Sequence, residues 1–290
     1  MQKQQALARQ TASIADSSAQ VTVIRPPGRW PGLGLDEFWR FRAISLVLAR
    51  RNLMVRYRQT IVGAAWTVIQ PIALMVLFTV FFGVLARMPS GDLPYAVFFY
   101  LGLWPFQMAS KILAEGSTSV VNNAALVTRV YFPRIFFPTS VGLASLLDLS
   151  LASVALIILL AVHGVVPGPQ VVAVPLLIAI GWFAALGVAY WLSALNVSYR
   201  DITQMLPFLA QLWMFGSPII YPARIIPEPF HTLYFLNPLA VVIEGIRWSI
   251  GGEPPPSAAA WLLGISSATA LLVSGYLVFR KREPTFSDVV

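Results

Sequence analysis

Long apolar runs dominate this chain, and a run that can cross a bilayer leaves few choices of fold. Six of them lie at about residues 62–86, 95–113, 139–162, 171–197, 203–221 and 258–279. Each is long enough, as an α-helix, to cross a hydrocarbon core of about 30 Å. The chain is 57% hydrophobic and 11% charged, which is more apolar surface than one soluble core can bury. We therefore predict an all-α integral membrane protein with six transmembrane helices.

Basic residues predict the orientation of these helices. If the N-terminus lies in the cytoplasm, all but three of the 20 Lys and Arg residues fall on the cytoplasmic side. The three on the opposite side are Arg87, Arg224 and Arg247. Cytoplasmic loops carry an excess of Lys and Arg, so the pattern predicts that both termini are cytoplasmic. Topology thus explains the net charge of +8, and no aromatic-laced basic patch indicates nucleic acid.

Two segments precede the first run. Residues 1–35 lack the apolar core of a signal peptide, so we predict that they form an uncleaved, mobile extension. Residues 36–61 predict an amphipathic helix that Asp36 caps. Its apolar stripe consists of Phe41, Ile44, Leu48 and Val55. Basic helices of this kind lie along the cytoplasmic membrane surface, with a solvated helix as the alternative.

Residues 116–138 form a polar segment between the second and third runs. Its side chains that are unsuited to lipid are Asn122, Asn123, Thr128, Arg129 and Arg134. Residues 122–131 contain no Gly or Pro and can form a short helix, which Pro133 and Pro138 separate from the next run. A short cytoplasmic helix suits the docking of a soluble partner, and an ordinary solvated loop is the alternative.

Residues 222–256, between the fifth and sixth runs, contain two short apolar pieces split at Asn237–Pro238. Neither piece can cross a membrane, so we predict a pair of re-entrant or interfacial helices on the outer side, bordering a pathway. Glu244 and Arg247 are three residues apart, a spacing at which opposite charges meet on a helix. They form either a local ion pair or part of an outer gate.

Other polar and aromatic residues lie within the runs. Asp148 sits well inside the third run, where a structural role is favoured over a functional one because no partner is evident. The fifth run carries Gln204, Gln211 and Pro218, so it belongs against other helices or a cavity. Most aromatic residues are expected in interfacial belts or helix packing. Candidates for lining a passage are Trp66, Phe78, Tyr95, Phe99, Trp104 and Trp213.

Catalytic chemistry has little support. The chain has no Cys, and His163 and His231 are isolated, so we expect neither a catalytic residue nor a metal site. The phosphate-binding pattern GxxxxGK[ST] is absent, so this chain does not bind ATP by that route.

Several stretches, taken together, resemble the permease subunits of ABC-2 type exporters of bacterial cell-surface polysaccharide. The similar stretches are RYRQTIVGAAWTVIQP (Arg56 to Pro71), Asn122 to Pro138, NVSYRDI (Asn196 to Ile202), NPLAVVIEGIR (Asn237 to Arg247) and EPTFSDV (Glu283 to Val289). Thr60 stands where the family usually has Ser, and the extension before Asp36 is unmatched.

The resemblance implies a homodimer in the bacterial inner membrane that works with two cytoplasmic ATPase subunits. Those subunits would bind ATP and Mg, and this chain would bind no cofactor. Residues 62–280 would be the six-span domain and residues 281–290 a cytoplasmic tail. The cargo would be an undecaprenyl-diphosphate-linked polysaccharide such as O-antigen.

The resemblance also implies residue roles. Contact with the ATPase would involve Asn122, Asn123, Leu126, Val127, Arg129 and Arg134. The substrate entrance would involve Arg56, Tyr57 and Arg58, since arginines suit a diphosphate. The periplasmic gate would involve Asn237, Pro238, Glu244 and Arg247. The alternatives are an ABC-2 exporter of drugs or small lipids and a membrane glycosyltransferase, which would need an acidic cluster that the cytoplasmic loops lack.

Overall fold

The structure is a computed structural model that describes residues 35–58, 65–129 and 132–286, without the side chains of residues 35–38, 40, 56–58 and 129. The predicted extension of residues 1–35 lies outside this part, apart from the backbone of Leu35. The described residues form helices and no strands. The α-helices are α2 (Leu35–Arg58), α3 (Trp66–Phe78), α4 (Tyr95–Lys111), α5 (Ala124–Arg129), α6 (Phe136–Val162), α7 (Val174–Asn196), α8 (Asp201–Phe215), α9 (Glu228–Phe235), α10 (Pro238–Gly251) and α11 (Ala258–Arg282). Short π-helical and 3₁₀ turns extend them at η2 (Thr79–Leu85), η3 (Ile112–Gly116), η4 (Val121–Asn123), η5 (Pro169–Ala173), η6 (Ala223–Ile225) and η7 (Glu283–Thr285).

Five of the described helices are long and apolar enough to cross a membrane. With their flanking turns they are Trp66–Leu85, Tyr95–Gly116, Phe136–Val162, Pro169–Asn196 and Ala258–Thr285. These match five of the six predicted runs to within a few residues at most boundaries. The sequence therefore locates the spanning helices well.

The predicted fifth run is shorter in the structure. Helix α8 ends at Phe215 because Gly216 and Pro218 follow, and Pro218 has no N–H to continue a helix. Its 15 residues give a length of about 22 Å, which is less than the hydrocarbon thickness of about 30 Å. A continuous spanning helix over residues 203–221 is therefore not observed.

Helix α4 forms the centre of the bundle and is buried along most of its length. It packs against α3, α6, α7 and α10. Around it, α7 and α11 pack closely, because a Cβ on Gly275 would lie 2.2 Å from the carbonyl oxygen of Gly187. Small residues allow such backbone contact between membrane helices.

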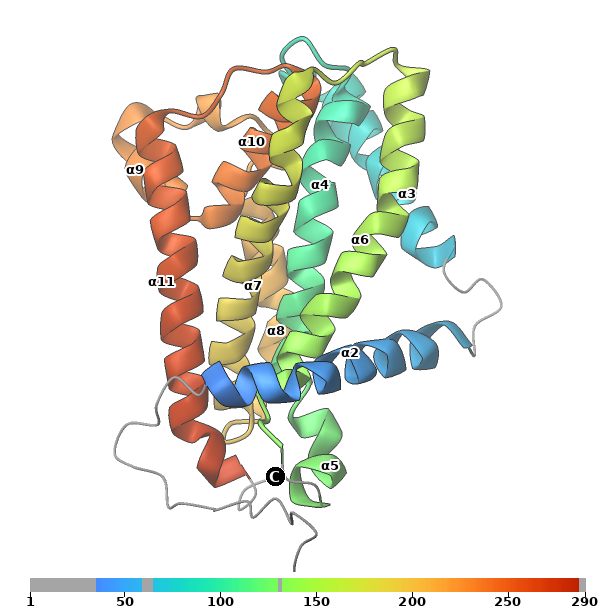
Figure 1. Cartoon of the computed structure of the whole chain (residues 1–290). Helices are drawn as coiled ribbons and strands as arrows, with labels where there is room; N and C mark the ends of the chain where they lie inside the picture. Colours follow the sequence, from blue (N-terminus) through green and yellow to red (C-terminus); the bar gives the residue numbers. More distant parts are fainter. Residues whose placement is uncertain (1–34, 59–64, 130–131, 287–290) are drawn as a thin grey trace, which may run out of the picture. The chain divides into compact units, whose positions relative to one another are not determined.

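Helices α7 and α11 run in the same direction. Gly187 lies against Leu271, and the indole Nε1 of Trp191 donates to Ser274 Oγ at 3.0 Å, so residue numbers rise together along both helices. The chain between them, residues 197–257, must therefore return from one end of the bundle to the other. We call the end near α2 and α5 the α5 end, and the end near α9 the α9 end (Figure 1).

Helix α2 lies across the spanning helices near the α5 end and packs against α6 (Figure 1). Phe41, Ile44 and Leu48, which the sequence assigns to one apolar stripe, are half-buried or buried among protein side chains, whereas Val55 is exposed. The helix is thus present as predicted, but most of its predicted stripe faces protein.

Candidate functional site

The segment between α4 and α6 is the strongest candidate for a partner contact. Helix α5, with η4 before it, lies beyond the spanning helices at the α5 end (Figure 1). Asn122, Ala125 and Thr128 are exposed and follow one another at three-residue spacing, so they share a face. We call residues 117–135, the part of the predicted segment 116–138 that lies between η3 and α6, the coupling segment, after the ATPase contact that the resemblance implies. Its predicted short helix is observed, and it presents a small polar face.

The other residues predicted for this contact have different surroundings. Leu126 is half-buried, and Val127 has only 2% of its surface exposed, so it packs inside the protein. Asn123 accepts a hydrogen bond from Arg51 of α2 and donates to the carbonyl of Ser119 at 2.7 Å. The side chain of Arg129 lies outside the described residues.

Arg134 is turned toward the end of α11. Its Nη1 donates to the carbonyl oxygen of Glu283 at 3.2 Å, and its own backbone N–H donates to Glu283 Oε1 at 2.5 Å. The other oxygen of the Glu283 carboxylate accepts from Arg280 Nη1 at 2.8 Å. Below this cluster the rings of Phe279 and Phe286 meet edge to face with centroids 5.2 Å apart. The end of the coupling segment is therefore fixed to α11.

The predicted entrance residues Arg56, Tyr57 and Arg58 occupy the last turn of α2, and their side chains lie outside the described residues. Elsewhere on α2, Asn52 donates to Ser140 Oγ of α6 at 3.3 Å, which fixes this helix to the bundle. The guanidinium of Arg42 lies 4.1 Å from the ring centre of Trp39 on the exposed side.

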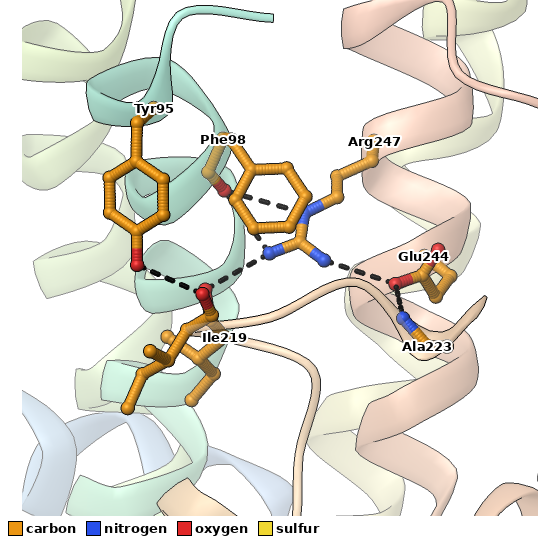
Figure 2. Close-up of polar contacts among 7 residues, drawn as sticks. Tyr95, Phe98, Ile219, Ala223, Glu244 and Arg247 are labelled. Atoms are coloured by element: carbon orange, nitrogen blue, oxygen red, sulfur yellow. Dashed lines mark hydrogen bonds and ion pairs between the residues drawn. The ribbon is translucent and has the colours of Figure 1, made fainter. Parts of the chain in front are cut away.

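A polar cluster at the α9 end centres on Arg247 of α10. Only 1% of its side chain is exposed, and its Nη1 donates to Glu244 Oε1 at 3.0 Å. Figure 2 shows the same guanidinium reaching the backbone carbonyls of Phe98, at 3.3 and 3.2 Å, and of Ile219, at 3.1 Å. Each of the three guanidinium nitrogens of Arg247 therefore has an acceptor inside the protein.

Neighbouring contacts complete this cluster. Glu244 Oε1 also accepts from the backbone N–H of Ala223 at 3.2 Å, and the hydroxyl of Tyr95 donates to the carbonyl of Ile220 at 2.9 Å (Figure 2). The predicted ion pair is therefore present, and it joins α10, α4 and the turn that follows α8.

Asn237 joins the same region to α8. It precedes α10 as its N-cap, accepting from the N–H of Leu239, and Pro238 occupies the first turn. Its Oδ1 accepts from Trp213 Nε1 at 3.0 Å, and its Nδ2 donates to the carbonyl of Gly216 at 2.9 Å. The predicted split at Asn237–Pro238 is confirmed, since α9 ends before it and α10 begins after it.

The candidate passage aromatics divide into two groups. Tyr95, Phe99 and Trp104 are buried in α4, and Trp104 Nε1 donates to the carbonyl of Leu149 at 3.2 Å. Phe78 stacks on Phe99 with ring centroids 4.7 Å apart, so helix packing describes these four residues. Trp66 is largely exposed on α3, and Trp213 is half-buried beside Asn237.

An ion pair between two of the spanning helices was not predicted from the sequence. Lys111 Nζ of α4 lies 2.5 Å from Asp148 Oδ2 of α6, so the intramembrane carboxylate has a basic partner. The signal was available, because both charges lie within apolar runs, where a lone charge is costly. The two histidines bond to backbone carbonyls, His163 to Leu159 and His231 to Ile226.

Comparisons with known proteins agree with this architecture. The model of the ABC-2 type transporter family matches residues 45–250, well over half of the chain. The O-antigen export system permease protein RfbA of Myxococcus xanthus is 26% identical over 256 residues, which cover 88% of this chain and 98% of that protein. RfbA of Klebsiella pneumoniae is 29% identical over 205 residues, covering 70% and 78%. The polysialic acid transport protein KpsM of Escherichia coli is 23% identical over 239 residues, covering 80% and 91%.

The family match and the apolar helices together describe a multi-pass membrane protein and a transport permease subunit. The matched residues begin within α2 and end within α10, so they include the coupling segment and the Arg247 cluster. This chain belongs to the ABC-2 type transporter family.

Proposed function

We propose that this chain is the membrane-spanning permease of an ATP-driven exporter of undecaprenyl-diphosphate-linked polysaccharide, such as O-antigen, across the bacterial inner membrane. It works as a homodimer with two copies of a cytoplasmic ATPase, which bind ATP and Mg. The names of the relatives, O-antigen export and polysialic acid transport, support a polysaccharide cargo. The observation that carries the proposal is helix α5, which lies beyond the spanning helices and leaves a polar face uncovered.

The face of α8 supports a pathway between two copies of the chain. Gln204, Phe208, Gln211 and Phe215 are all exposed, and their spacing of four, three and four residues puts them on one side of the helix. An amide that faces lipid without a partner costs several kcal/mol, at least about 2. This face is therefore expected to meet water or a second copy of the chain, and its aromatic rings suit the C–H faces of sugars.

Residues 197–257, which return the chain from the α5 end to the α9 end, support six crossings in all. Helix α8 rises from the α5 end, and residues 216–227 and α10 carry the chain on to the α9 end, where Gly251 packs against Leu93. These two pieces then make the fifth crossing along the chain in place of one long helix, and α11 makes the sixth. Irregular backbone at membrane depth is tolerated where protein buries it, and Ser217 to Ile220 are buried.

The charges support the orientation. The α5 end carries Arg51, Arg134, Arg200 and the basic end of α11, whereas the α9 end carries Arg87, Arg224 and the buried, paired Arg247. By the positive-inside rule the α5 end is cytoplasmic, where it meets the ATPase. Residues 56–58 at the end of α2 then receive the lipid diphosphate, and the α9–α10 pair closes the outer exit.

The test uses the exposed face of α5. We expect Ala125→Glu to reduce co-purification with the ATPase and to reduce surface polysaccharide, because an unpaired carboxylate is buried when the ATPase docks. Gln170→Glu, which adds the same charge at an exposed position in η5 at the opposite end, is the matched control and retains both. Mass spectrometry of lipid bound to the complex identifies the cargo. Normal co-purification and export by Ala125→Glu, or a bound lipid without glycan, contradict the proposal.

A further inference from the structure

Asn196 is a fully buried amide at the point where three elements meet. It is the last residue of α7, and 0% of its surface is exposed. Its Nδ2 donates to the carbonyl of Ser117, the first residue of the coupling segment, at 3.1 Å. Its Oδ1 accepts from Thr203 Oγ1, in the first turn of α8, at 3.0 Å. One side chain thus joins the start of the coupling segment to the start of α8.

The coupling segment is held closely against α7 at this point. A Cβ on Gly116, the residue just before the segment, would lie 3.0 Å from the Cβ of Ala189, so the backbone that leads into the segment lies directly on α7. Its other end is held by Glu283 at the end of α11, and α11 in turn lies in backbone contact with α7. Two anchors of the segment therefore belong to one tightly packed pair of helices.

Helix α8 is packed differently. Leu206 is its one fully buried residue among those described, and most of its other side chains are exposed. It packs against η3, which leads into the coupling segment, and against α7. A helix held by few contacts can shift as a unit when a contact at its first turn moves. Asn196 is the last residue of α7, so its side chain can follow Ser117 while the packed body of the α7–α11 pair stays in place.

We propose that Asn196 is a positioning residue that transmits displacement of the coupling segment to α8 through Thr203. This inference rests on the function proposed above, because it assigns a route from the ATPase contact to the face that meets the pathway. An amide suits this role because it donates at one end and accepts at the other. Alanine makes neither bond, and aspartate keeps an acceptor for Thr203 but cannot donate to Ser117.

The experiment follows α8 in the complete complex with the ATPase. The chain has no cysteine, so Gln211→Cys gives a single reactive thiol on the pathway face of α8. Its rate of labelling by a water-soluble maleimide is measured without nucleotide and with ATP and vanadate. ATP hydrolysis by the same complex is measured in parallel, because a merely structural defect would lower hydrolysis and complex yield as well.

We expect Asn196→Ala and Thr203→Val to keep ATP hydrolysis while the nucleotide-dependent change in labelling falls about fivefold, the factor for losing one partly buried hydrogen bond of about 1 kcal/mol. Thr203→Ser restores the hydroxyl and is expected to keep the change. Because Thr203 is exposed, its two variants should fold, and they test the proposal even if Asn196→Ala gives too little folded protein.

The proposal is overturned if Thr203→Val keeps the nucleotide-dependent labelling, or if Thr203→Ser loses as much of it as Thr203→Val. A failure of the proposed function is recognised separately. In that case the protein with unsubstituted Asn196 and Thr203 binds no ATPase, or its Gln211→Cys thiol is unreactive in every state, and the inference falls with it.

Discussion

Replacing Arg247 with Met should strongly destabilise the α9 end of the protein. Methionine fills a similar volume but removes the donor to the carbonyls of Phe98 and Ile219 and the positive partner of Glu244, which keeps the N–H of Ala223. Removing one partner of a buried ion pair costs about 3–5 kcal/mol. Because 18% of the Glu244 side chain is exposed to solvent, we expect a loss of stability in the lower part of this range, about 3 kcal/mol.

The measurement is thermal unfolding of the detergent-solubilised protein. At about 2 °C per kcal/mol for a chain of this size, Arg247→Met should lower the melting temperature by about 6 °C. Arg224→Met removes an exposed arginine at the same end and should change it little.

Adding Glu244→Gln to Arg247→Met removes the orphaned charge and should recover part of the stability. A loss below about 1 kcal/mol in Arg247→Met would refute the reasoning, because it would place the pair among exposed salt bridges.

Two further predictions concern helix contacts. Gly187→Ala should reduce the amount of folded protein in membranes, since its Cβ would lie 2.4 Å from the backbone of Leu271. Gly181→Ala is the control and should be tolerated, because its Cβ would lie 3.5 Å from the nearest atom. Equal yields of the two variants would contradict the close packing at Gly187. Lys111→Met should lower the free energy of unfolding by about 3 kcal/mol in the same thermal assay. The double variant Lys111→Met with Asp148→Asn should lose less, and strictly additive losses would contradict a direct ion pair.

Local signals in the sequence account for the correct parts of the predicted fold. Apolar runs of sufficient length locate five spanning helices, because membrane insertion depends mainly on length and hydrophobicity. Asn237–Pro238 predicts the boundary between α9 and α10, because Asn caps a helix and Pro favours its first turn.

The same reasoning fails where a local signal is ambiguous. Residues 203–221 are apolar enough to be read as one helix, although Gly216 and Pro218 stop it at Phe215. Lys111 and Asp148 were each interpreted alone, because no periodicity links positions on two different helices. Tyr95 and Phe99 are aromatic residues near one end of a spanning helix, so the sequence allows either a buried position or one lining a passage. Only the structure shows that both are buried in α4.

The hydrogen bonds that anchor the coupling segment are the hardest to predict from sequence, since each joins a side chain to a main-chain group. Asn196 binds the carbonyl of Ser117 and Glu283 binds the N–H of Arg134, and every residue but proline offers both groups. The identity of the side chain at 117 or 134 does not predict these bonds, and Arg134 was assigned to the ATPase contact by the family resemblance. In the structure its guanidinium donates to the carbonyls of Glu283 and Val127. A loss of export in Arg134→Glu would therefore arise from repulsion of Glu283 and release of the segment from α11, and Glu283→Gln should reproduce part of it without altering the exposed face of α5.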